Sequence, residues 1–155
     1  MSCLYFIKGG INMAVSYYSV PVQIVTPGNN ILFTSTQIGC KKNLVLHSED
    51  SGVITLRAAG NTCFTRYRIS FNANVAVATD ETEVGAIEFT ISRNGEPRTS
   101  STMIVTPANN DEYFNISRDI IIDVPRGIAI DIGVRNTGEI DANVQNASII
   151  IDRIA

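Results

Sequence analysis

Apolar and polar residues alternate along residues 66–77, and this alternation is the clearest structural signal in the chain. The positions of one set are apolar, namely Tyr67, Ile69, Phe71, Ala73 and Val75. The positions between them are arginine, serine and asparagine. Successive side chains of a strand point to opposite faces, so a period of two predicts a strand with one buried face. We therefore expect this strand to contribute its apolar set to the core.

Shorter strand-like runs follow one another from Val20 to the end of the chain, with turn-forming residues between them. Asn94-Gly95 separates two such runs and is a strong signal for a two-residue hairpin, because both residues tolerate positive φ. No segment shows the 3.6-residue period of an amphipathic helix. About ten strands at this spacing are typical of two antiparallel sheets with Greek-key connections. The prediction is an all-β, ten-stranded antiparallel jelly-roll sandwich with no significant helix.

The last predicted strand, residues 144–154, is apolar on both faces. Ala147, Ile149 and Ile151 share one face, and Ile150 and Ile154 share the other. Three consecutive isoleucines cannot all face one core, so at least one exposes apolar area unless another layer or subunit covers it. This pattern predicts self-association with closed rotational symmetry.

Composition narrows the function classes. The 155 residues suit a single domain, and a content of 45% hydrophobic and 17% charged residues excludes a disordered chain. The net charge of -3 provides no positive field for phosphates, so neither nucleic acid nor an anionic membrane is an expected partner. Cys3, Cys40 and Cys63 are interpreted as reduced structural thiols, with a Cys40–Cys63 disulfide as the alternative.

Residues 1–19 are set apart from the predicted domain, residues 20–155. Residues 8–10 can be encoded by a purine-rich sequence of the ribosome-binding type, and residues 11–12 then provide a short spacer before Met13. We therefore interpret residues 1–12 as translated leader and Met13 as the natural start; the alternative is an N-terminal arm that docks on a neighbour. Tyr17 and Tyr18 are large amphipathic side chains, and we expect them to anchor an attachment arm, with a disordered terminus as the alternative.

The residue types that catalysis or metal binding would need are not gathered in a recognisable motif. His47 is the one histidine and is interpreted as a half-exposed strand residue rather than a ligand. Asp119, Asp123 and Asp131 could supply carboxylates to Ca²⁺, but the spacing of a calcium loop is absent. Nucleotide-binding, esterase and zinc motifs are absent too. We therefore expect a protein that is not an enzyme, with no catalytic residue, metal or cofactor.

Three segments of the sequence, residues 65–74, 88–95 and 146–151, resemble the sequences of a known fold family. This family comprises the tumour-necrosis-factor-like (TNF-like) jelly rolls, as in the C-terminal domains of exosporium collagen-like proteins and in bacteriophage virion proteins. The resemblance covers about residues 20–155 and implies a parallel homotrimer around a threefold axis. The residues expected at the trimer interface are Tyr67, Phe71, Ile149, Ile150 and Ile151. No Gly-X-Y stalk precedes residue 20, which argues against the exosporium role.

A stalkless jelly roll without a catalytic motif suits a protein that folds, trimerises and attaches to an assembled shell. We expect a structural protein of a bacteriophage virion: a trimeric capsid decoration or head surface protein, made in the host cytoplasm. Its expected partners are further copies of itself and the major capsid protein or another virion protein. The alternative is a carbohydrate- or receptor-binding module of a phage fibre or of a bacterial surface (collagen-like) protein. The absence of tryptophan argues against sugar stacking.

Overall fold

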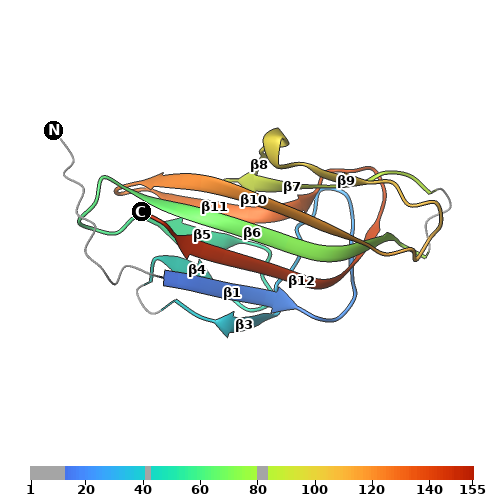
Figure 1. The fold of residues 1–155 in the computed structure, drawn as a ribbon, viewed down its shortest axis with the longest axis horizontal. Helices are drawn as coiled ribbons and strands as arrows, with labels where there is room; N and C mark the ends of the chain where they lie inside the picture. Colours follow the sequence, from blue (N-terminus) through green and yellow to red (C-terminus); the bar gives the residue numbers. More distant parts are fainter. Residues whose placement is uncertain (1–12, 41–42, 80–83) are drawn as a thin grey trace.

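The protein is a sandwich of two antiparallel β-sheets (Figure 1). The computed structural model describes residues 13–40, 43–79 and 84–155. The predicted leader and Cys3 lie outside the described residues. Within these ranges the one helical element is a 3₁₀ turn, η1 (Thr99–Ser101), and no helix is long and apolar enough to cross a membrane. The all-β prediction is confirmed.

The sheet nearest the viewer in Figure 1, here called the front sheet, has the strand order β10-β6-β12-β1-β3. A short strand, β2, pairs with the beginning of β12. The bounds of these strands are β1 (Met13–Ser19), β2 (Gln23–Val25), β3 (Ser35–Ile38), β6 (Phe64–Val77), β10 (Phe114–Pro125) and β12 (Ala142–Arg153).

The second sheet, here called the back sheet, has the strand order β4-β5-β11-β7-β8, and β9 pairs with β7. Its strands are β4 (Val45–His47), β5 (Ile54–Arg57), β7 (Ile87–Arg93), β8 (Glu96–Pro97), β9 (Met103–Val105) and β11 (Ala129–Asn136). The described residues thus form twelve strands rather than ten, and the two additional strands are β1, which lies before the predicted domain, and the two-residue β8. β4–β5 and β7–β8 are pairs of consecutive strands, whereas β12–β1, β10–β6 and β11–β5 pair strands that are distant in sequence, as jelly-roll connections require.

The alternation along β6 places its apolar set in the core, as predicted. Tyr67, Ile69, Phe71, Ala73 and Val75 are each at most 1% exposed. The ring of Phe71 meets that of Phe33 edge-on, with centroids 6.5 Å apart. The core is completed from the back sheet by residues such as Ile130, Ile132 and Val134 of β11. Burial of these side chains between the sheets is the main stabilising contribution to the fold.

Residues 13–19, the described part of the predicted N-terminal segment, form a strand of the sandwich and not an arm. Strand β1 pairs with β12 along its whole length, from Met13 opposite Arg153 to Ser19 opposite Ala147. Val15 and Tyr17 point inward and are at most 3% exposed. The predicted domain boundary at Val20 therefore falls one strand too late. The reason is that two inward apolar residues are too few for the period of two to be recognised, although pairing with β12 buries both.

The hairpin between β7 and β8 has the predicted turn, with φ of 50° at Asn94 and 81° at Gly95. The second of the two runs that Asn94-Gly95 separates does not form one continuous strand but is divided into β8, η1 and β9. Residues 99–101 form η1, and Ser101, which is fully buried, donates its hydroxyl to the carbonyl of Arg98 at 2.6 Å and accepts the amide of Ile91 at 3.0 Å. These hydroxyl bonds replace part of a strand ladder, which residue propensities alone do not reveal.

The cysteines differ from the prediction of three reduced thiols. Cys63 is disulfide-bonded. Cys40 is a thiol whose Sγ lies 3.3 Å from the Sδ of Met13. The alternative Cys40–Cys63 disulfide is therefore also wrong.

Candidate functional site

Four of the five residues expected at a trimer interface lie inside a single chain. Tyr67, Phe71, Ile149 and Ile151 are at most 1% exposed and pack between the two sheets. The hydroxyl of Tyr67 donates to the backbone carbonyl of Arg57, and burial raises the pKa of Tyr67 to about 12. Their placement at the interface is wrong because they occupy the alternate positions of β6 and β12 whose side chains point into the core. The side chains available to another subunit are those at the intervening positions, which point outward.

Ile150 is at one of these outward-pointing positions and is 40% exposed on the outer face of the front sheet. It is paired with Ser70 of β6 on one side and with Ser16 of β1 on the other. The same row continues to Ile38 of β3, which is 54% exposed. The structure thus leaves Ile150 as the one predicted interface residue that a second chain could cover.

The two predicted attachment residues, Tyr17 and Tyr18, are consecutive in β1, so their side chains point to opposite faces of the front sheet. Tyr17 is buried, and its ring centroid lies 4.5 Å from that of His47. The role of Tyr17 as an exposed anchor is therefore wrong. Tyr18 is half-buried on the outer face of the front sheet, where it pairs with Ser148. It belongs to the same surface as Ile150.

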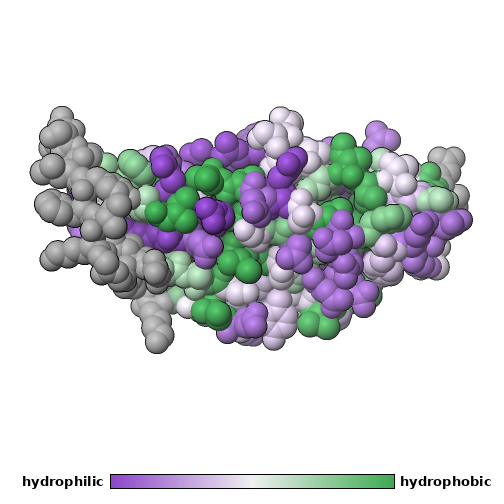
Figure 2. All heavy atoms as spheres, in the orientation of Figure 1, coloured by the Kyte–Doolittle hydropathy of each residue, from purple (hydrophilic) through white to green (hydrophobic). Residues whose placement is uncertain are grey.

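The outer face of the front sheet is broad and carries mainly small polar side chains. Ile121 of β10 is 55% exposed on it, and serine and asparagine residues of β6, β10 and β12 surround the isoleucines. Figure 2 shows apolar patches interrupted by polar side chains over this face. The ion pair between Arg66 Nε and Asp123 Oδ1, at 2.7 Å, spans its β6–β10 side and holds the pKa of Asp123 below its usual value.

The candidate metal ligands do not converge. Asp119 and Asp123 lie on the outer face of the front sheet, whereas Asp131 lies on the back sheet. The ring nitrogen Nε2 of His47 donates to the carbonyl of Ser51 at 2.9 Å. Among the described residues no group of three histidine, cysteine or acidic side chains could hold a metal ion.

A groove on the outer face of the back sheet is built where residues 28–33 run beside β11. Asn30 lies directly opposite Arg135, and the amide of Ile31 donates to the carbonyl of Val134 at 2.8 Å. Gly133, two positions before Arg135, faces the same side and leaves room for the amide group of Asn30. That amide donates from Nδ2 to the carbonyl of Gly52 at 3.1 Å. We call this feature the outer-face groove.

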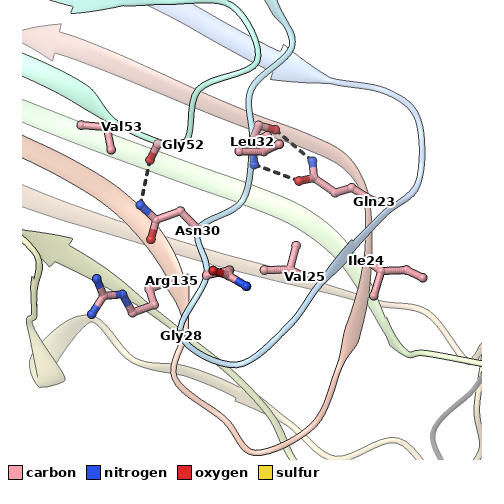
Figure 3. Close-up of a pocket in the computed structure, with 10 residues that line it drawn as sticks. Gln23, Ile24, Val25, Gly28, Asn30, Leu32, Gly52, Val53 and Arg135 are labelled. Atoms are coloured by element: carbon pink, nitrogen blue, oxygen red, sulfur yellow. Dashed lines mark hydrogen bonds between the residues drawn. The ribbon is translucent and has the colours of Figure 1, made fainter.

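The outer-face groove consists of two adjoining hollows of about 450 Å³ and about 260 Å³, which share Asn30, Val53 and Arg135. The larger hollow is walled by Gln23, whose side-chain amide makes two hydrogen bonds with the backbone of Leu32. The smaller hollow is lined by Ser92, Asn94, Gly95, Asp131, Ile132 and Gly133 in addition to the shared residues. Figure 3 shows Arg135 directed away from Gln23 and Ile24.

Two polar atoms in the outer-face groove are buried without a hydrogen-bond partner in the described part of the chain. These are Oδ1 of Asn30 and Nε of Arg135. At the other end of the smaller hollow, Asp131 Oδ1 accepts the hydroxyl of Thr55 at 2.6 Å. The groove therefore offers a cationic donor, a carbonyl acceptor and a carboxylate on one surface.

Sequence reasoning did not identify this groove, although part of its signal is local. The alternation along residues 128–135 places Asp131, Gly133 and Arg135 on one outward face. Asn30 is more than a hundred positions away in the sequence, and only the pairing of residues 28–31 with β11 brings it to Arg135.

Comparison with known proteins identifies the fold through solved structures. No protein-family model matches the chain, and no curated protein is significantly similar to it in sequence. The structure of Eiger TNF from S. frugiperda superposes with a TM-score of 0.66 at 11% identity, over 93% of each chain. Murine APRIL gives 0.62 at 12% identity, over 92% of this chain and all of that one. The globular domain of zebrafish complement 1qA gives 0.60 at 8% identity, over 91% and 94%. At these identities the likeness establishes the fold, a TNF-like jelly roll.

Proposed function

We propose that this TNF-like jelly-roll domain is a homotrimeric structural protein of a bacteriophage virion, one that attaches to the surface of an assembled head. The observation that carries the proposal is the outer face of the front sheet. It is five strands wide, no other described segment of the chain covers it, and it presents Ile38, Ile121 and Ile150 among small polar side chains. The resemblance of the sequence to virion jelly rolls supplies the virion setting.

The dimensions of this face support self-association. Strands of 12–14 residues, such as β6, β10 and β12, extend about 40 Å at roughly 3.3 Å per residue. Five strands about 4.8 Å apart add a width of about 20 Å. A face of roughly 800 Å² is the area that each partner contributes to a standard specific interface. Closed symmetry lets three copies cover one another without leaving a growing edge, and the family resemblance favours three over two.

A binding or structural role, without catalysis, agrees with the chemistry of the described residues. His47 is engaged with Ser51 and packs against Tyr17, so it does not face a cavity with an adjacent nucleophile. The one salt bridge in the described part of the chain, Arg66–Asp123, is an exposed surface pair. An enzyme active site would need a concave surface with an acid, base or nucleophile within hydrogen-bond reach of one another.

Two measurements test this proposal. The first is the mass of the assembly of the full chain by analytical ultracentrifugation, for which we expect three chain masses and for which a monomer is the contrary result. The second is quantitative mass spectrometry of purified particles of the phage whose genome carries the gene. We expect the chain in a copy number comparable with that of the capsid subunits. Its absence from particles that contain the other head proteins would overturn the virion role.

The alternative, a carbohydrate- or receptor-binding module, is favoured by the outer-face groove. The smaller hollow of this groove lies on the back sheet, on the opposite side of the sandwich from the proposed trimer face. It would therefore stay open to solvent in a trimer that associates through the front sheets. A trimeric surface protein can accordingly present three such grooves.

A further inference from the structure

We propose that the outer-face groove binds an acidic sugar, with its carboxylate on Arg135 and its hydroxyl groups on Asn30 and Asp131. This inference deepens the alternative binding role and rests on the groove alone, so it is independent of the virion role and of the trimer. It is carried by two buried, unpartnered polar atoms on residues that line one hollow, and by the carboxylate at the other end of that hollow.

Arg135 supplies the charge recognition. It is half-buried, and its Nε is buried without a hydrogen-bond partner in the described ranges. Leaving a charged donor desolvated and unpaired is costly, so the site is better satisfied when an acceptor is bound. A guanidinium presents its donors as a planar fork that matches the two oxygens of a carboxylate.

Asn30 supplies the complementary acceptor. Its Nδ2 is engaged with Gly52, whereas its Oδ1 is buried and unpartnered. Figure 3 shows this oxygen turned away from Gly52, towards the side on which Arg135 lies. A carbonyl oxygen accepts hydrogen bonds and donates none, so the ligand must bring an O–H or N–H beside its negative charge. The hydrogenphosphate dianion carries a single O–H donor, whereas a sugar acid has several.

Gly133 fixes the position of the Asn30 amide. A Cβ built on Gly133 would come within 2.6 Å of Asn30 Nδ2 and within 2.8 Å of the Gly52 carbonyl oxygen. A side chain at position 133 would therefore displace the amide and fill the floor of the groove. The missing side chain is what gives the smaller hollow its depth between Asp131 and Arg135.

Asp131 provides the second polar contact for a polyhydroxylated ligand. It faces the same side of β11 as Arg135, four residues away, which is about 13 Å along a strand. Its neighbour across the strands is Thr55, and Ser92 and Asn94 line the space between. A lining in which acceptors outnumber aliphatic groups favours a sugar over an apolar peptide side chain.

The experiment is a two-dimensional NMR titration of the full-length protein with methyl β-D-glucuronide. Matched titrations use its neutral counterpart, methyl β-D-glucoside, and inorganic phosphate. We expect saturable shifts at the amides of Asn30, Gly133 and Arg135 with the glucuronide, and binding weaker by about tenfold or more with the glucoside, since a charge-assisted hydrogen bond is lost. Glucoside or phosphate binding as strong as glucuronide binding, or no saturable shift at these amides, would overturn the proposal.

Single substitutions test whether the glucuronide binds in the outer-face groove. We expect Arg135→Gln to weaken glucuronide binding by about tenfold or more, whereas Arg126→Gln, at an exposed arginine of the turn after β10, leaves it unchanged. Asn30→Asp is a second variant, which places a carboxylate opposite Arg135 and should block the site by internal pairing. Undiminished binding by a folded Arg135→Gln or Asn30→Asp protein contradicts the assignment. The oligomeric state is measured on the same samples, so a failure of the trimer is seen separately.

Discussion

Ile149 and Ile150 are consecutive in β12 and lie on opposite sides of the front sheet. Ile149 is fully buried opposite Phe71, whereas Ile150 is 40% exposed opposite Ser70. One residue therefore stabilises the sandwich, and the next is available to a second chain. Mutations at neighbouring positions should accordingly separate folding from assembly.

Substitution of Ile150 with lysine should dissociate the proposed trimer while the chain stays folded. The side chain lies on the outer face of the front sheet, and a trimer would bring three lysine ammonium groups into a desolvated interface. The matched control is Ile104→Lys, because Ile104 is 63% exposed on β9 of the back sheet. Analytical ultracentrifugation gives the mass of each protein. If Ile150→Lys sediments as the wild-type trimer does, this face is not the interface.

Substitution of Phe71 with alanine should lower the free energy of unfolding by roughly 3 to 5 kcal/mol, because it removes a large, fully buried side chain and leaves a cavity. Ser70→Ala, at the adjacent outward position, should change it by less than about 0.5 kcal/mol in the monomer. Urea unfolding followed by circular dichroism measures both. Equal effects of the two substitutions would contradict the inward orientation of Phe71.

The phenol of Tyr67 should make the protein less stable at alkaline pH. Its pKa is raised to about 12 in the folded protein, against an ordinary value of 10.0, because burial disfavours the phenolate. The contribution of the neutral phenol is thus fully present below pH 10 and is lost as the pH rises through about 12. Tyr67→Phe should lack this part of the alkaline loss, and its ultraviolet titration should lack the tyrosine that ionises last. A titration identical to that of the wild type would contradict the raised pKa.

Introduction of alanine at Gly133 should destabilise the fold by about 1 to 3 kcal/mol, because the added methyl group would overlap the amide of Asn30. Gly60→Ala is the control, since a Cβ at Gly60 meets nothing within 4 Å. Thermal unfolding of the two variants gives the comparison. An unchanged melting temperature for Gly133→Ala would show that Asn30 moves aside at little cost.

The sequence by itself determined which residues of each long strand face the core. The alternation along residues 66–77 and the two-sided apolar pattern of residues 144–154 are local properties of a pleated strand, and the structure confirms both sets of faces. The Asn94-Gly95 turn is equally local, because positive φ at two successive positions depends on those residues alone. The TNF-like jelly roll could be predicted because the spacing of its strands and the three short segments that resemble the family are local features of the sequence.

Only the tertiary structure decided which strands became neighbours. Strand β1 has too few inward apolar residues to be recognised, and it becomes a strand because β12 supplies hydrogen-bond partners along its whole length. Burial of Tyr67 and Ile149 in one chain removed them from the interface, since both sheets contribute to the core that covers them. Asn30 reaches Arg135 through the pairing of residues 28–31 with β11. A period of two is set within a strand, whereas strand order and register are set by contacts between residues far apart in the sequence.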